Sequence, residues 1–306
     1  MNRLTLTEFA SLTVLVLLLA VAKSTAAADP EPIRVATLLP FVEDALELVP
    51  NRVVVVASVR RSMHSPLDPD LIDLGNPHSP NFERLAEARP QIIVGDKQIH
   101  AVLADRLDVL GAQVLLIDTS GIDSMLSALS DLSTSIGGSP LLDARIAAVR
   151  KELATLELGE SLRVLPLFGA PGSFYAITDR AWLGQLVTEL GFDNLAPARG
   201  DERFPGLVVV SDEVISTLEP DIVLLVAHGD PRKIQADLEQ RTRAGGAWAS
   251  LGKASHGIHV LDPGLFAANP GLDVDRAAKE LIAISEAPPA AGAGSLPSVA
   301  GGPESR

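Results

Sequence analysis

Short apolar runs rich in β-branched residues alternate with amphipathic segments along the first half of this chain. The runs predict strands over residues 33–39, 52–57, 91–94 and 113–117. The amphipathic segments predict helices over residues 42–49, 101–110 and 124–136. The run at residues 52–57 contains four consecutive valines, which is typical of a strand buried on both faces.

The second half of the chain repeats this rhythm. Strands are predicted over residues 163–168, 221–226 and 257–261, and helices over residues 181–190, 232–243 and 275–285. The alternation of strands with helices favours an α/β fold with parallel sheets. Between the halves, apolar residues fall on one stripe of a long helix over residues 140–158; they are Leu142, Ile146, Val149, Leu153 and Leu156.

One phrase occurs in both halves. Residues 83–94 read ERLAEARPQIIV and residues 213–224 read EVISTLEPDIVL, so that Glu83 matches Glu213 and Pro90 matches Pro220. The two copies are too far apart for a solenoid, whose repeats are about 20–50 residues long. The sequence therefore predicts two similar lobes, one on each side of the long helix.

The composition excludes several classes of protein. The chain has 306 residues, and 47% of them are hydrophobic, which is enough for a substantial core. Its net charge of −14 and its aromatic content of 4% argue against nucleic-acid binding. The chain contains no cysteine, so disulfides, thiolate metal sites, cysteine nucleophiles and a lipid-modified cysteine are excluded.

The N-terminal segment has the pattern of an export signal. Arg3 precedes an apolar stretch at residues 12–22, and three alanines at residues 26–28 offer a cleavage site. An uncleaved anchor helix is the alternative, but the stretch is shorter than the roughly 20 residues that span a bilayer. At the other end, residues 287–306 are rich in Ala, Gly, Pro and Ser and predict a disordered tail.

The order of these segments resembles a known family. The segments are RVATLLPFVEDALELV, NFERLAEARPQIIVGD, GSFYAITDRAWLGQLVTELGFDNL, PDIVLLVAHGD and AWASLGKASHGIHVLD. Together they are similar to the helical-backbone (class III) solute-binding proteins of ABC importers. The resemblance implies two similar parallel-sheet α/β lobes joined by one long helix, with a ligand cleft between the lobes. The expected parts are a signal peptide (1–28), an N-terminal lobe (29–138), the connecting helix (139–158), a C-terminal lobe (159–286) and the tail (287–306).

The same resemblance implies a role for the two matched glutamates. In this family one glutamate on each lobe docks to basic residues of the membrane permease, and Glu83 and Glu213 occupy the corresponding positions. A simpler explanation is that each glutamate favours the N-terminus of its helix, an effect of about 0.3–1 kcal/mol.

Ligand-binding residues are expected in the loops that follow the strands, because ligands of open α/β sheets bind outside the carboxyl ends of the strands. Arg60 and Arg61 follow the valine strand and suit an anionic ligand, although a solvated basic turn is the alternative. Tyr175, the single tyrosine, is predicted on a glycine-containing loop or, alternatively, in the core. The other expected ligand-binding residues are Phe41, His64, Lys97, Phe174 and His228.

A bare metal ion is the alternative ligand. Asn76-Pro77-His78 resembles the Asp-Pro-His segment of the zinc and manganese branch of the superfamily, in which the histidine binds metal. In this chain Asn76 replaces the aspartate, and the second such segment of that branch is absent. A metal site of this kind would use His78, His100 and Asp230.

No sequence motif of a hydrolase, phosphate-binding loop, zinc protease or dinucleotide-binding enzyme is present. We therefore expect a monomeric periplasmic receptor, without catalytic residues or a required cofactor, that captures a metal chelate of the ferric siderophore, cobalamin or haem type. Its expected partners are the permease and ATPase subunits of an ABC importer. An exported enzyme or a binding module that has lost transport on the same fold is the alternative of another class.

Overall fold

The computed structural model describes residues 31–49, 51–59, 70–156, 161–198, 202–266 and 268–287. It divides the chain into two compact units, residues 1–32 and 33–306, and the elements below all belong to the second unit. The predicted signal peptide, the segment with Arg60, Arg61 and His64, and the predicted tail beyond residue 287 lie outside the described residues. Within the described ranges, no helix is both long and apolar enough to cross a membrane.

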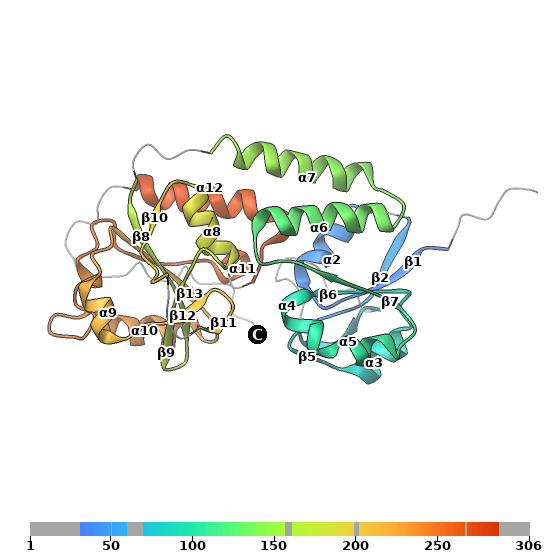
Figure 1. Ribbon diagram of the computed structural model, residues 1–306, viewed down its shortest axis with the longest axis horizontal. Coiled ribbons are helices and arrows are strands. Elements are labelled where there is room, and N and C mark those ends of the chain that lie inside the picture. Colours follow the sequence, from blue (N-terminus) through green and yellow to red (C-terminus); the bar gives the residue numbers. More distant parts are fainter. Residues whose placement is uncertain are drawn as a thin grey trace, which may run out of the picture. The chain divides into compact units, whose positions relative to one another are not determined.

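The first lobe contains a five-stranded sheet in the order β3-β2-β1-β6-β7, and all its pairs are parallel (Figure 1). Its strands are β1 (Ile33–Thr37), β2 (Val53–Ser58), β3 (Ile72–Asp73), β6 (Ile92–Asp96) and β7 (Gln113–Ile117). The helices of this lobe are α2 (Pro40–Leu46), α3 (Phe82–Ala88), α4 (Lys97–His100), the 3-10 turn η1 (Ala101–Leu103), α5 (Ala104–Asp108) and α6 (Ile122–Ser135). A small hairpin of β4 (Gly75–Asn76) and β5 (Ser79–Pro80) precedes α3.

The valine strand β2 is less buried than its sequence predicted. Only Val56 of the four valines is buried, and Val54 is 39% exposed. The reason is the shortness of β3, which pairs only with Ala57 and Ser58 at the end of β2. Among the described residues, the first half of β2 therefore pairs only with β1, and only its second half has a partner strand on both sides.

The second lobe contains a seven-stranded sheet in the order β11-β12-β9-β8-β13-β14, with β10 also paired to β8. Its strands are β8 (Arg163–Ala170), β9 (Ser173–Ile177), β10 (Asp193–Asn194), β11 (Glu202–Phe204), β12 (Leu207–Val209), β13 (Ile222–Ala227) and β14 (Ile258–Val260). The helices are α8 (Trp182–Glu189), α9 (Asp212–Thr217), α10 (Pro231–Thr242), α11 (Pro263–Phe266) and α12 (Val274–Glu286), with 3-10 turns η2 (Leu251–Lys253) and η3 (Gly271–Asp273).

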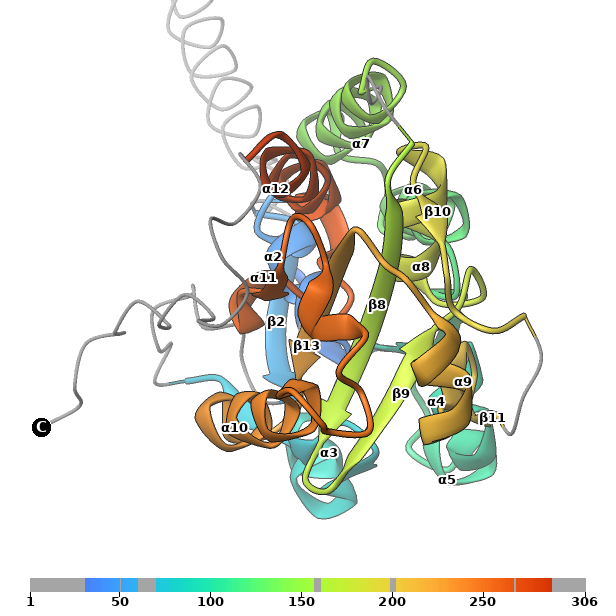
Figure 2. The ribbon, with the colours of Figure 1, turned by 90° about the vertical axis from the view of Figure 1, so that its left-hand side faces the viewer.

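The two-lobed α/β fold class is confirmed, with one difference in the second sheet. We expected parallel strands, but β9 runs antiparallel to β8 (Figure 2). Strand β12 in turn runs antiparallel to β9. The chain reverses at Pro171-Gly172, where Gly172 has a φ of +75°, a conformation that glycine adopts without strain. The second sheet is therefore mixed, and residues 173–177 form a strand where a loop was expected.

The connecting helix α7 spans Pro140–Leu153, a shorter stretch than the predicted 140–158. Pro140 occupies its first turn, and the Ser139 hydroxyl accepts a hydrogen bond from the Leu142 amide. Leu142, Ile146 and Val149 form the buried stripe that the spacing predicted. This stripe packs α7 against α6 of the first lobe and α12 of the second (Figure 1).

One hydrophobic cluster is shared by the two lobes. It includes Val35 and Val94 from the first sheet and Val164 and Leu224 from the second, together with the buried faces of α6, α7 and α12. Two smaller clusters lie within single lobes, one around Leu165 and Trp248 and the other around Leu38 and Ile93. The lobes are therefore packed on a common core as well as joined by α7.

Candidate functional site

The repeated phrase has the same local structure in both lobes. Each copy begins with a capping side chain: Asn81 accepts a hydrogen bond from the Arg84 amide, and Ser211 accepts one from the Val214 amide. Glu83 and Glu213 are then the second residues of α3 and α9, and both are exposed. The strand that follows each copy, β6 or β13, begins at the matching position. The two glutamates thus occupy equivalent places, and both face solvent.

The carboxyl ends of β6 and β7 carry a group of polar side chains. Asp96 is buried, and its Oδ1 accepts hydrogen bonds from the amides of Gln98 and Ile99 at 2.7 and 2.8 Å. Its Oδ2 accepts a hydrogen bond from the hydroxyl of Thr119, which follows β7. Asp96 therefore fixes the start of α4 against the end of the neighbouring strand.

A charged pair lies at the same edge of the sheet. The hydroxyl and amide of Ser120 donate hydrogen bonds to Oδ1 of Asp118 at 2.6 and 3.0 Å. These bonds, together with the nearby charge of Lys97, hold the pKa of Asp118 below its ordinary value. Lys97 is exposed at the start of α4. The edge thus offers a cation, an anion and a hydroxyl to a ligand.

The second sheet carries a row of rings, which we call the aromatic row: His228, Phe168, Tyr175 and Phe204. The His228 ring stacks on Phe168 with centroids 5.4 Å apart, and Phe168 lies 6.3 Å from Tyr175. Tyr175 in turn meets Phe204 edge to face at 6.5 Å. His228 is exposed directly after β13, and Phe204 is 51% exposed at the end of β11.

The aromatic row exists because of the antiparallel strand β9. Phe168 and Tyr175 are direct partners in the β8–β9 ladder, so their side chains share one face of the sheet. The sequence analysis identified Tyr175 and His228 but missed Phe168 and Phe204. No local pattern marks these two phenylalanines, since the four rings come from separate parts of the chain and meet only through the strand order.

Three expected ligand-binding residues are buried: Phe41, Phe174 and Tyr175, the last of which is 7% exposed, as the core alternative for it predicted. Phe41 is 4% exposed and packs so closely on η3 that a Cβ at Gly271 would lie 2.6 Å from the Phe41 Cβ. Phe174 is 5% exposed and meets Trp248 edge to face at 5.3 Å. Phe174 points to the opposite face from Tyr175 because consecutive residues of a strand alternate. Both phenylalanines therefore support the fold, which is a different role from the expected one.

The histidines expected to bind metal have other surroundings. His100 is fully buried: its Nδ1 accepts a hydrogen bond from the Asp96 amide at 2.7 Å, and its Nε2 donates to the Pro77 carbonyl at 2.8 Å. Burial lowers the pKa of His100, which favours the neutral ring that these bonds require. His78 is exposed beside the small hairpin, and Asp230 caps α10 by accepting from the Arg232 amide. Nowhere in the described ranges do three or more His, Asp or Glu side chains form a metal-binding group.

Two amide side chains of the second lobe hold the turn between β7 and α6. Oε1 of Gln185 accepts a hydrogen bond from the Ile122 amide at 3.0 Å, and Nδ2 of Asn269 donates to the Thr119 carbonyl at 3.3 Å. A Cβ at Gly121 would lie 2.5 Å from Oε1 of Gln185, so a larger residue there would displace the Gln185 side chain from its hydrogen bond. Sequence reasoning found neither amide, since nothing local distinguishes them from other surface residues.

Comparisons with known proteins agree with this architecture. No protein-family model matches the chain. The high-affinity heme uptake system protein IsdE of Staphylococcus aureus (strain bovine RF122 / ET3-1) is 22% identical over 219 residues, which is 69% of this chain and 73% of the relative. The solved structure of S. aureus IsdE complexed with heme has a TM-score of 0.68 at 18% identity, over 83% of this chain and 99% of that one.

Two further structures have the same fold. An ABC transporter substrate-binding protein from Listeria monocytogenes EGD-e has a TM-score of 0.69 at 20% identity, over 83% of this chain and 98% of that one. The periplasmic vitamin B12 binding protein BtuF of Vibrio cholerae has a TM-score of 0.61 at 15% identity, over 83% and 96%. The chain is therefore similar to the helical-backbone (class III) solute-binding proteins of ABC importers and has their fold.

Proposed function

We propose that this protein is the receptor of an ABC importer, and that it captures a metal-containing organic chelate and delivers it to the permease. The fold and the relatives support this proposal, because their names describe heme uptake and vitamin B12 binding. With its predicted signal peptide removed, the protein would work in the periplasm of a host with two membranes. The boundaries at residues 138 and 158 remain proposals for the limits of the lobes.

Two surfaces are suited to hold the ligand. The aromatic row offers an apolar group of rings, with Tyr175 buried in the middle and the exposed imidazole of His228 and the half-exposed ring of Phe204 at its ends. Lys97, Asp118 and Ser120 form a polar edge at the carboxyl ends of the first lobe's strands, where open α/β sheets bind ligands. Arg60, Arg61 and His64 stay in the proposal, because they follow β2 and parallel strands bring their carboxyl ends to one edge.

The aromatic row with His228 is the observation that carries the choice of ligand class. A planar macrocycle can stack on rings, and a neutral imidazole nitrogen is a good ligand for iron or cobalt. The described residues provide no hydrogen bond to the His228 ring nitrogens, so its imidazole can face a ligand. A lysine at the polar edge would pair with a carboxylate of the same molecule. We therefore propose a metal tetrapyrrole as the ligand, with His228 as the metal-binding side chain.

A haem titration of the purified protein tests this choice. We expect a saturable Soret band whose position shifts in the His228→Ala variant, because that variant loses a metal ligand. His78→Ala serves as the matched control, since His78 is also exposed but lies on the first lobe's hairpin. The absence of a Soret shift in His228→Ala would remove His228 from the site. Stoichiometric zinc or manganese without a chromophore would instead favour a receptor for the bare ion.

For delivery, we propose that Glu83 and Glu213 dock to basic residues of the permease. Their equivalent, exposed positions on α3 and α9 support this role, since one contact on each lobe would report how the lobes are oriented. Reversing both charges, Glu83→Arg with Glu213→Arg, should abolish uptake and leave ligand affinity unchanged. Uptake at the wild-type rate would contradict the docking role and would favour a binding module that kept the fold without transport.

A further inference from the structure

An arginine lies over the aromatic ring of the residue that precedes Glu83, the first of the two glutamates proposed to dock. The guanidinium carbon of Arg106, in α5, is 3.7 Å from the centroid of the Phe82 ring. Phe82 is the first residue of α3 and directly precedes Glu83. Arg106 is exposed, and within the described part of the chain its guanidinium has no ion pair or hydrogen bond. Its donors are therefore free to face solvent.

The second lobe repeats this arrangement with different residues. The guanidinium carbon of Arg241 lies 5.2 Å from the Trp248 ring and 5.3 Å from the Phe174 ring. Trp248 donates a hydrogen bond from Nε1 to Oδ1 of Asp212 at 2.7 Å. Asp212 is the first residue of α9 and directly precedes Glu213. In the first lobe the ring under the arginine belongs to the first residue of the helix that carries the glutamate. In the second lobe a ring next to the arginine is hydrogen-bonded to the first residue of that helix.

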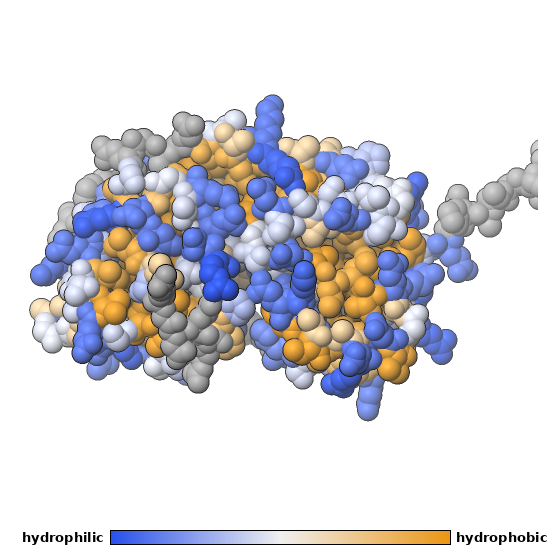
Figure 3. All heavy atoms as spheres, viewed as in Figure 1, coloured by the Kyte–Doolittle hydropathy of each residue, from blue (hydrophilic) through white to orange (hydrophobic). Residues whose placement is uncertain are grey.

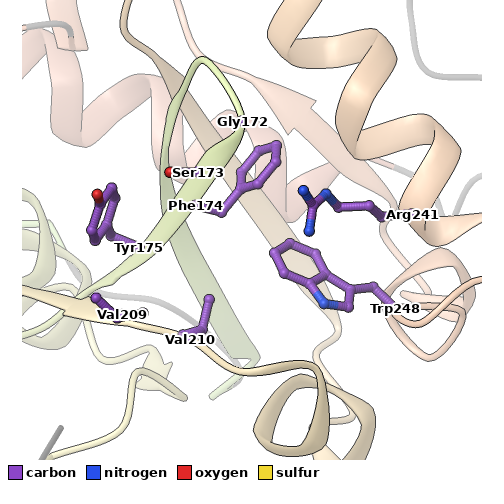
Figure 4. Close-up of a pocket in the computed structure, with 8 residues that line it drawn as sticks. All are labelled: Gly172, Ser173, Phe174, Tyr175, Val209, Val210, Arg241 and Trp248. Atoms are coloured by element: carbon purple, nitrogen blue, oxygen red, sulfur yellow. The ribbon is translucent and has the colours of Figure 1, made fainter. Parts of the chain in front are cut away.

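A cavity of about 220 Å³ lies beside the second arginine. Figure 4 shows the Arg241 guanidinium between the side chains of Phe174 and Trp248, and Val209 and Val210 also line the cavity. Nε of Arg241 donates to Asp237 at 3.1 Å, and no residue described by the structure bonds to its two terminal nitrogens. The terminal nitrogens can therefore bind a group that enters from outside.

Exposed apolar side chains accompany both arginines. Val102 and Val109 are each 85% exposed. Val102 lies four residues before Arg106 and Val109 three residues after it, so all three lie on one side of the helical segment. Val209 and Val214 are 44% and 39% exposed near the second arginine and glutamate. In Figure 3, hydrophobic residues interleave with charged ones over α4 and α5. Aromatic residues and arginine are enriched in protein interfaces, so these surfaces suit a protein partner.

Stacking on a ring gives the guanidinium a defined orientation. The ring face stabilises the cation, while the planar edge keeps its donors directed outward in a fork that matches a carboxylate. Each lobe thus presents an exposed glutamate, which under the proposed docking function meets a basic partner, together with one arginine. A partner with only basic groups would meet the glutamates but would be repelled by the arginines. Paired charges of this kind raise the specificity and the rate of association more than the affinity itself.

We propose that each lobe carries a two-charge docking patch, Glu83 with Arg106 and Glu213 with Arg241, for a permease surface that presents a basic and an acidic side chain to each lobe. This inference rests on the proposed docking function. The aromatic rings of Phe82 and Trp248 hold the two arginines in place. The cavity beside Arg241 receives the acidic side chain on the second lobe.

The test measures binding of the full-length receptor to its cognate permease complex in nanodiscs. Arg106→Glu and Arg241→Glu should each weaken docking about tenfold or more, as expected for a charge pair at an interface. Arg243→Glu is the matched control, because Arg243 is exposed two residues after Arg241 and contacts neither ring. Phe82→Leu keeps the charge of Arg106 and removes its ring, so it should weaken docking by a smaller factor. Ligand affinity should be unchanged in all four variants.

Two results separate this inference from the docking function itself. If both arginine reversals dock as tightly as Arg243→Glu while the double glutamate reversal fails to dock, the two-charge patch is wrong and the glutamate contact stands. If the double glutamate reversal docks normally, the docking function fails as well. If Arg241→Glu unfolds the protein, Arg241→Gln replaces it, and its melting temperature is compared with that of wild type to show that it is folded. Normal docking of a folded Arg241→Gln would also overturn the patch.

Discussion

Arg145 of α7 binds both carboxylate oxygens of Asp275 in α12, at 2.7 and 2.9 Å. The same guanidinium donates a third hydrogen bond to the Leu272 carbonyl at 2.6 Å. Asp275 is 3% exposed, so this pair is largely removed from water on the carboxylate side. It attaches the connecting helix to the second lobe next to the shared core.

Replacing Arg145 by Met should destabilise the protein by about 3 kcal/mol, because it leaves a buried carboxylate without its partner. Urea unfolding at pH 7 measures this change. Arg276→Met is a suitable control, since Arg276 forms a more exposed pair with Asp273 at 2.8 Å and should cost at most about 1 kcal/mol. Equal losses in the two variants would contradict the buried role of Arg145.

The same pair predicts a dependence on pH. Burial alone would raise the pKa of Asp275, but the hydrogen bonds and charge of Arg145 outweigh burial and hold the pKa below its ordinary value. The contribution is therefore complete above the ordinary carboxyl pKa and is lost as the pH falls through the lower folded value. Between pH 6 and pH 3, the Arg145→Met variant should lose less stability than wild type. Parallel stability curves would exclude this linkage.

His100 should make the folded protein less stable in mild acid. Its folded pKa is lowered by burial from 6.5, so the folded state favours the neutral ring and the unfolded state binds the proton more readily. The contribution is present above about pH 6.5 and is lost as the pH falls through the lower folded value. His100→Ala should leave the Asp96 amide and Pro77 carbonyl unpaired, at about 1–3 kcal/mol for each group. Unfolding at pH 7.5 and pH 5.5, with His78→Ala as control, measures both effects.

The Gly121 turn offers a test by double substitution. In Gly121→Ala the new Cβ would collide with Oε1 of Gln185 and displace its hydrogen bond to Ile122. We expect a loss of about 1–3 kcal/mol from this overpacking. In a Gln185→Ala background the same substitution should cost much less, because the colliding atom is gone. Additive losses measured by urea unfolding would show that Gly121 is required for another reason.

Phe41 distinguishes a core role from a ligand role. Because its ring is buried against η3, Phe41→Ala should destabilise the protein by about 3–5 kcal/mol. Ligand affinity of the folded fraction should remain close to wild type at a temperature where the variant is still folded. A large loss of affinity with little loss of stability would return Phe41 to the binding site.

The sequence was informative where its signals were local. The stripe of Leu142, Ile146 and Val149 needs only helical spacing, and it predicted the buried face of α7. The matched phrases likewise predicted equivalent positions for Glu83 and Glu213, since each phrase contains its own cap and strand.

Sequence reasoning was less informative where a role depends on distant partners. His100 looked like a metal ligand because its partners, the Asp96 amide and the Pro77 carbonyl, are backbone groups that no side-chain pattern reveals. Phe174 and Tyr175 were expected together on a loop, but a strand sends them to opposite faces. The Pro171-Gly172 pair, which is typical of a turn, was the sequence signal that could have predicted a second strand there.

The core shared by the two lobes has a consequence for how the protein unfolds. Val94 and Leu224 belong to different sheets but to one cluster, so separating the lobes would expose apolar surface on each. The lobes should therefore melt in a single cooperative transition, and a calorimetric scan should show one peak rather than two. A single lobe placed in another protein would therefore expose its part of the shared hydrophobic cluster to water.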